Sequence, residues 1–129
     1  MSIRCERNLR CMLKCAFDIS CTDMEVYIEL LKRGQSIVEE LAEALKKDNS
    51  TIYKSLQTLL DKGLVKRDYK ILRTGGYRYV YRPIEFEKLK QEIIKNLQSL
   101  IEEVTNFLKE LEKYTEEKVV QSLTIKEQA

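Results

Sequence analysis

Four cysteines near the N-terminus are the side chains of this sequence best suited to metal or redox chemistry. They follow the spacing C-x5-C-x3-C-x5-C and are Cys5, Cys11, Cys15 and Cys21. Four thiolates can hold zinc or an iron–sulfur cluster, but the short C-x2-C spacing common in such sites is missing. The cysteines can also form disulfides or a redox switch, as in intracellular proteins of hyperthermophiles. A third interpretation treats Cys15 and Cys21 as small core residues, so the sequence leaves three roles open.

The sequence has no histidine among its 129 residues. It therefore lacks the usual general base near neutral pH and the commonest metal ligand. It also lacks a glycine-rich loop that could cradle a phosphate, and most of its acidic residues resemble helix caps or solvated positions. Serine or cysteine nucleophiles would have no recognisable base. We predict that the protein is not an enzyme.

Basic residues concentrate between positions 62 and 82. This segment has seven Lys and Arg against one acidic residue, although the net charge of the whole chain is only +2. Residues 1–83 carry 16 basic and 11 acidic side chains, and residues 84–129 carry 7 basic and 10 acidic ones. A local positive surface of this kind attracts the phosphate backbone of a nucleic acid.

Polar side chains between residues 49 and 60 form a second group with binding chemistry. After the apolar residues are assigned to the core, hydroxyls, an amide and one cation remain outside, with no acid between them. Such groups suit the phosphates and base edges of DNA, although each one taken singly is equally suited to capping, packing or solvation. Two arginines beside Gly75-Gly76 join the group, unless they serve to keep an edge strand soluble. The candidate DNA-binding residues are Ser50, Thr51, Tyr53, Lys54, Gln57, Thr58, Arg73 and Arg78.

Three helices and a hairpin are expected to position these residues. Apolar spacing and helix-start signals predict helices over residues 22–33, from about residue 36 to Asp48, and from about residue 49 to Gly63. β-branched and aromatic runs on either side of the glycine pair predict a β-hairpin that ends at Pro83. The expected caps are Thr22 with Glu25, Ser36 with Glu39, and Asn49 or Ser50.

A heptad repeat from about Glu85 onward predicts a long final helix. At about 30 residues it would be about 45 Å long, more than one small domain can cover, so we expect it to pair with a second copy. The alternative is a helix folded back on its own domain, and the tail after Tyr114 either extends the helix or frays. The expected dimerisation residues are Ile93, Leu97, Leu100, Val104, Phe107 and Leu111.

The order of elements predicts a mainly α (α+β) fold, a winged helix-turn-helix. It has a three-helix core, a two-stranded hairpin as the wing, and a long C-terminal dimerisation helix. We expect a cysteine-bearing segment over residues 1–21, a DNA-binding winged helix over 22–83, and a coiled-coil helix over 84–129.

Residues 23–68 resemble archaeal winged-helix regulators of the TrmB and MarR-like type. The resemblance lies in "VYIELLKRG" and in "VEELAEALKKDNSTIYKSLQTLLDKGLVKR", and "GGYRYVYRP" at 75–83 resembles a wing of that group. It implies a dimeric DNA-binding transcription regulator from an archaeon. Because no effector domain follows the long helix, we do not expect the sugar recognition of some members.

The leading hypothesis is therefore a homodimeric regulator that binds a specific double-stranded DNA sequence, with redox or metal control through the cysteines. The alternative is a winged-helix scaffold that binds other proteins and has no specific affinity for DNA. The N-terminus lacks the uninterrupted apolar block of a secretory signal, and no apolar run is long enough to span a membrane. We expect a cytoplasmic protein.

Overall fold

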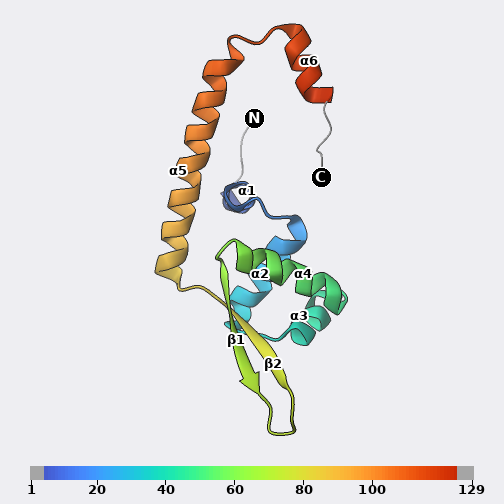
Figure 1. Cartoon of the computed structure of the whole chain (residues 1–129). Helices are drawn as coiled ribbons and strands as arrows, with labels where there is room; N and C mark the ends of the chain where they lie inside the picture. The colour runs from blue at the N-terminus through green and yellow to red at the C-terminus, as the bar shows by residue number, and fades with distance from the viewer. Residues whose placement is uncertain (1–4, 125–129) are drawn as a thin grey trace. The chain divides into compact units, whose positions relative to one another are not determined.

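The computed structural model describes residues 5–124, with side chains from residue 9 onward. It contains six helices and one antiparallel hairpin, which follows the first four helices (Figure 1). This order confirms the winged-helix prediction. The described chain forms two compact units, divided between Asn96 and Leu97. The elements are α1 Cys5–Phe17, α2 Cys21–Arg33, α3 Val38–Leu45, α4 Asn49–Asp61, β1 Val65–Ile71, β2 Tyr77–Pro83, α5 Phe86–Leu111 and α6 Glu116–Thr124.

The core of the first unit lies where α2, α3 and α4 meet the base of the hairpin. Apolar side chains recur at helical spacing on the inner face of each helix, and most of them are fully buried. Leu13 and Ala16 of α1 pack against the same core at its edge. Residues with no exposed surface are Val26, Leu30, Leu41, Ile52, Leu56 and Leu59.

The helix starts differ from the predicted ones. The capping box of α2 joins Ser20 and Asp23, each accepting from the other's backbone N–H at 3.0 Å, rather than Thr22 and Glu25. This places the start of α2 at Cys21 and the half-buried Thr22 inside the helix. Asn49 and Ser50 are likewise not the cap of α4. The N-cap is Asp48, whose carboxylate accepts from the backbone N–H of Thr51.

The start of α3 also lies later than predicted. Ser36 is not the N-cap, and the helix begins at Val38. The Ser36 hydroxyl instead donates to the Glu40 carboxylate at 3.1 Å, and the same oxygen accepts from the Ile37 backbone N–H at 3.4 Å. At the other end, Lys46 takes the left-handed conformation with φ 56°, so α3 stops at Leu45, before the predicted Asp48.

The hairpin has the predicted glycine turn and ends at the predicted Pro83. β1 and β2 pair antiparallel from Val65 opposite Pro83 to Ile71 opposite Tyr77. Gly75 and Gly76 have φ values of 96° and 80°, which side chains with a Cβ rarely adopt. The sheet gains one further bridge, in which Ser36 and Tyr81 exchange backbone hydrogen bonds of 2.9 and 2.8 Å. The turn between α2 and α3 is therefore held to the base of the wing.

Two helical features were not predicted. The N-terminal segment forms α1, whose apolar residues are separated by basic ones and give a weak pattern in the sequence. The final helix stops at Leu111, so Tyr114 lies in the following turn rather than in the heptad row. A separate helix, α6, starts where the Thr115 hydroxyl accepts from the Lys118 backbone N–H at 3.2 Å. Of the tail residues left open, Ile125 lies outside the described residues.

No helix in the described part of the chain is long and apolar enough to cross a membrane.

Candidate nucleic-acid interface

Helix α4 turns one face to the core and the opposite face outward. Ile52, Leu56 and Leu59 are fully buried at spacings of four and three residues, which fixes the rotation of the helix. Ser50, Tyr53 and Lys54 are consequently exposed, with 46% of Tyr53 accessible. The other three predicted residues of this helix are half-buried: Thr51, Gln57 and Thr58.

Several of these side chains already have partners on α4. The Gln57 amide donates to the Tyr53 hydroxyl at 2.8 Å, and the Thr58 hydroxyl donates to the Lys54 carbonyl at 3.2 Å. The Ser50 hydroxyl donates to the Asp48 carboxylate at 3.3 Å. Lys54 makes no side-chain hydrogen bond or ion pair with any residue that the structure describes. Its ammonium group is the cation of this face that is available to a ligand.

Asp48 is the acidic group closest in sequence to this face. It accepts from the Thr51 backbone N–H at 2.9 Å, and hydrogen bonds from Thr51 hold the pKa of Asp48 below its ordinary value. The carboxylate is thus committed to capping the helix as an anion. A negative charge stabilises a helix N-terminus, so its presence beside the outward face has a structural reason.

The wing has an aromatic face that sequence reasoning missed. Tyr69 and Tyr77 stack with ring centroids 4.7 Å apart, and Tyr79 meets both rings edge-on at 5.7 and 5.8 Å. The Arg67 guanidinium lies 4.2 Å from the centroid of Tyr79. The alternation of tyrosines at 77, 79 and 81 was the available signal, because alternate residues of a strand share one face.

Arg67 ties this face to the buried base of the wing. Its hydrogen bond with Tyr81 raises the pKa of Arg67 above its ordinary value, so it stays a cation. Burial raises the pKa of Tyr81, and the interaction with Arg67 only partly opposes this shift. Both groups therefore keep their protons near neutral pH. The Arg67 guanidinium thus remains a positive charge beside the tyrosines of the wing.

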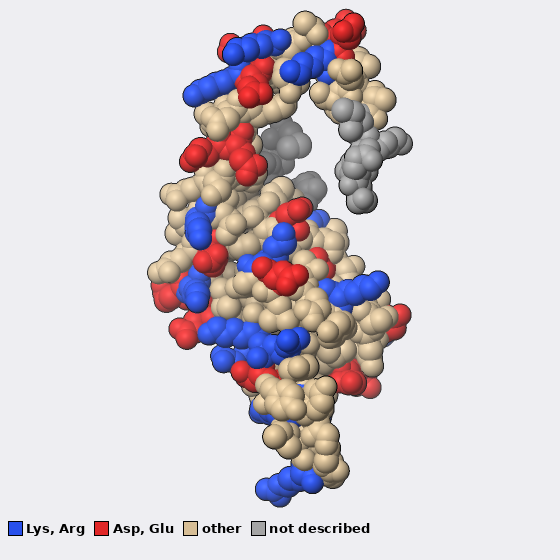
Figure 2. All heavy atoms as spheres, in the orientation of Figure 1, with Lys and Arg blue, Asp and Glu red and all other residues tan. Residues whose placement is uncertain are grey.

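The opposite face and the tip of the wing are basic. Lys66 faces Arg82, and Lys70 faces Arg78 across the strands. The predicted residue Arg73 lies in the exposed turn at the tip. Lys and Arg side chains gather at the end of the hairpin and again around its base (Figure 2).

A cleft of about 330 Å³ brings α4 and the wing together. Tyr53 from α4 and Arg78 from β2, both predicted from the sequence, line it from opposite sides. The tip residue Arg73 is not part of its lining. The remaining lining residues are Val38, Glu39, Tyr77, Tyr79 and Tyr81. Three separated parts of the sequence, in α3, α4 and β2, thus present one surface of aromatic, hydroxyl, guanidinium and carboxylate groups.

The cysteines are separate from this surface. Cys11, Cys15 and Cys21 are exposed free thiols, so the interpretation of Cys15 and Cys21 as core residues is wrong. The Cys5 side chain lies outside the described residues. No three His, Cys, Asp or Glu side chains in the described part of the chain are placed to hold a metal ion. The Lys14 ammonium group donates to the Cys21 sulfur at 2.8 Å, and this contact raises the pKa of Lys14.

The apolar row on α5 is open. Ile93, Leu97 and Leu100 are half-buried, whereas Val104, Phe107 and Leu111 are 49%, 50% and 40% exposed. A neighbouring row of isoleucine and leucine is more exposed still, at 56–64%. A helix face this apolar is normally covered by another surface. The second row consists of Ile94, Ile101 and Leu108.

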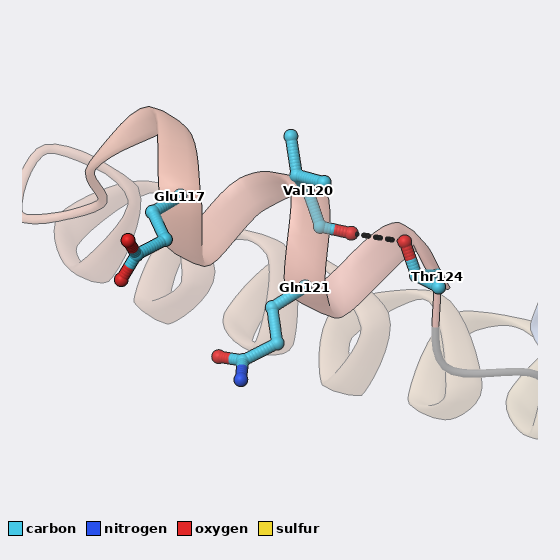
Figure 3. A pocket seen from close by; sticks show the side chains of 4 residues that line it. All are labelled: Glu117, Val120, Gln121 and Thr124. Atoms are coloured by element: carbon cyan, nitrogen blue, oxygen red, sulfur yellow. Dashed lines mark hydrogen bonds between the residues drawn. The ribbon is translucent and has the colours of Figure 1, made fainter.

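A shallow hollow on α6 is not a plausible ligand site. Its lining residues Glu117, Val120, Gln121 and Thr124 all come from one helix (Figure 3). The Thr124 hydroxyl donates to the Val120 carbonyl at 2.6 Å and is thereby satisfied. A surface with a single wall cannot enclose a ligand.

Comparisons with known proteins cover the same region. Residues 13–87 match the family model of TrmB, described as a sugar-specific transcriptional regulator. An uncharacterized protein of Methanocaldococcus jannaschii is 37% identical over 101 residues, or 78% of this chain and 76% of that protein. A possible transcriptional regulator from Methanosarcina mazei superposes with a TM-score of 0.70 at 28% identity, covering 79% of this chain and 87% of that one. A protein from Sulfolobus tokodaii, at 22% identity, has a TM-score of 0.62 over 74% of this chain and 93% of its own, and supports the fold alone.

Proposed function

The chain belongs to the TrmB family of winged-helix transcriptional regulators, and we propose that it binds a specific duplex DNA sequence as a homodimer. The family makes it a transcription regulator and not an enzyme. The observation that supports the finer proposal is the cleft in which Tyr53, on the outward face of α4, meets Arg78 and the tyrosines of the wing. A helix for the major groove and a basic ribbon beside it are the parts that a winged helix uses on DNA.

In this proposal α4 reads base edges. The Lys54 ammonium group has no partner among the described residues, and Gln57 keeps its carbonyl oxygen and one N–H after donating to Tyr53. Both groups suit the major-groove edges of base pairs. Ser50 and Thr58 donate their hydroxyl protons to Asp48 and to the Lys54 carbonyl, so each would exchange that partner for a phosphate on binding DNA. Arg73 and Arg78 extend the contact along the wing.

Pairing through α5 would supply the second half-site. The apolar row from Ile93 to Leu111 repeats with heptad spacing, and its exposure in the single chain supports a partner helix. A symmetric dimer places two copies of α4 on successive turns of the major groove, about 34–36 Å apart. The proposal therefore predicts a palindromic operator.

Selection of duplexes from a fragmented genomic pool by the full chain tests this function. We expect one palindromic sequence to be enriched. Lys54→Ala should relax the base preference at one position in each half-site, at a cost of about 1–3 kcal/mol. Arg73→Ala should weaken all duplexes alike and lower the salt slope by about 0.9. Lys88→Ala, an exposed lysine on α5, is the control of equal charge.

The scaffold hypothesis makes the opposite prediction. A protein-binding module would show only weak association with duplexes, without sequence preference, and this association would vanish as salt rises. No enrichment in the selection, together with equal effects of Lys54→Ala and Lys88→Ala, would exclude sequence-specific binding.

The contact between Lys14 and Cys21 supports thiol control of DNA binding as an added function. Cys21 is exposed at the first residue of α2, and the Lys14 ammonium group donates to its sulfur at 2.8 Å. We propose that the Cys21 thiolate attacks a peroxide, forming an S–O bond while the O–O bond breaks and hydroxide leaves. Oxidation would remove the contact that links α1 to the start of α2.

Peroxide treatment of the full chain, followed by mass spectrometry and DNA titration, tests the thiol. We expect oxygen addition at Cys21 and a change in DNA affinity that Cys21→Ser abolishes. Cys11→Ser, which alters an exposed cysteine without this lysine contact, should leave the response intact. Equal oxidation of Cys11 and Cys21 would contradict the proposal.

A further inference from the structure

Two pairs of like charges face each other across the wing. Lys66 lies opposite Arg82, and Lys70 lies opposite Arg78, all on the same face of the hairpin. Like charges directly opposite on antiparallel strands repel and destabilise the pairing. An anion close to such a pair offsets this repulsion.

Only the first pair has its anion within the described protein. The Arg82 guanidinium donates to the Asp68 carboxylate at 2.9 Å, next to Lys66 on the same face. No ion pair within the described part of the chain reaches Lys70 or Arg78. The second pair therefore has no ion-paired carboxylate among the described residues.

A polar hollow of about 450 Å³ opens beside this second pair. Lys70 and Arg78 form one side, and Arg33, Gln35 and Ser36 of the turn after α2 are on the other. The Arg33 guanidinium is partly neutralised by Glu29 at 3.0 Å, but it adds N–H donors. The backbone bridge from Ser36 to Tyr81 fixes the two sides relative to each other. The hollow thus has basic side chains from both the wing and the end of α2 in its lining.

One acidic residue also lines the hollow. Glu40 contributes a carboxylate, but one of its oxygens accepts from the Ser36 hydroxyl at 3.1 Å and from the Ile37 backbone N–H at 3.4 Å. It therefore caps the start of α3 and forms no ion pair with the facing cations. Its negative charge lowers the affinity of the hollow for an anion. Removal of this charge should therefore strengthen anion binding, whereas removal of the Lys70 charge should weaken it.

We propose that this hollow binds a phosphate group through Lys70 and Arg78. The inference deepens the proposed function and rests on it for one source of the ligand, the DNA backbone. The other source is free phosphate. Because Ser36 and Ile37 lie just before α3, a backbone phosphate here would anchor the start of the helix-turn-helix and the wing at one point. Lys70 is a contact that the sequence did not single out.

Titrations of the full chain with duplex DNA at several salt concentrations test the backbone source. Lys70→Gln should lower the slope of log affinity against log salt by about 0.9, the loss of one phosphate contact. Lys66→Gln is the matched control, because it removes the same charge from the same strand and face. Glu40→Gln keeps the cap acceptor and should tighten binding.

Thermal unfolding in inorganic phosphate, against chloride at equal ionic strength, tests the free source without DNA. A phosphate-specific rise in the wild-type midpoint that Lys70→Gln abolishes would assign the site to free phosphate. In phosphate-free buffer, Lys70→Gln should itself raise the midpoint by roughly 2–4 °C, since it removes a repulsion. Lys66→Gln, whose facing arginine is already paired, should not.

The outcomes separate this inference from the proposed function. Specific duplex binding with equal salt slopes for wild type, Lys70→Gln and Lys66→Gln, and no phosphate effect on the midpoint, would overturn the site and leave the function intact. Equal loss in both lysine variants would also overturn it, because it would show only diffuse attraction. Absence of duplex binding by the wild type would refute the function, and the phosphate titration alone would then decide the site.

Discussion

Truncation of Phe107 to alanine tests the dimer through the most exposed aromatic side chain of the predicted heptad row. Half of Phe107 is accessible in the single chain, and a partner helix can cover at most this accessible half. Full burial of such a side chain is worth about 3 kcal/mol, and half is therefore about 1–1.5 kcal/mol. Because a symmetric dimer contains two copies, the loss is about 2–3 kcal/mol, or a roughly 30- to 150-fold rise in the dimer dissociation constant.

Sedimentation equilibrium over a range of protein concentrations measures this constant directly. Lys109→Ala is the control, since two residues along a helix turn a side chain about 200° away from the row. Circular dichroism should show unchanged helix content in both variants. A Phe107→Ala chain that dimerises as tightly as the wild type, or a wild type that stays monomeric at high concentration, would refute the assignment of the row.

Two further predictions concern stability. Tyr27→Phe removes a buried hydroxyl that has no partner among the described atoms, and should raise the unfolding free energy by about 1 kcal/mol in urea titrations. Burial raises the pKa of Tyr27 to about 12, so the folded state holds a proton that the unfolded chain releases above pH 10. Stability should fall between pH 10 and 12 in the wild type, and less steeply in Tyr27→Phe. Ser20→Ala removes the side-chain cap of α2 and should cost about 1 kcal/mol, whereas Ser99→Ala on the exposed face of α5 should cost almost nothing.

Local patterns in the sequence predicted the hairpin and the outward face of α4. Gly75 and Gly76 are required by positive φ at both positions, and such a requirement is visible in the residues themselves. The buried row of Ile52, Leu56 and Leu59 fixes the rotation of α4 in the same local way. Helix starts were predicted less well, because several Ser, Thr and Asp residues compete within a few positions and packing selects among them.

Features that depend on pairing between distant residues could not be predicted. Lys70 and Arg78 are eight positions apart, and their apposition follows only from the register of the strands. Lys14 reaches Cys21 across the break between α1 and α2, where Asp18 takes the left-handed conformation. The spacing of the cysteines alone therefore indicated clustering, but not which thiol would lie beside a cation.

The two hydrogen bonds between Ser36 and Tyr81 attach the base of the hairpin to the turn between α2 and α3. The distal end of the hairpin, from Ile71 through the turn to Tyr77, has no such bridge to another element among the described residues. Its proximal half moves only if the turn after α2 moves with it. A change that tilts α2 would therefore move the hairpin and the start of α3 together. Contacts of the wing and of the helix-turn-helix with the duplex would then form or break at the same time.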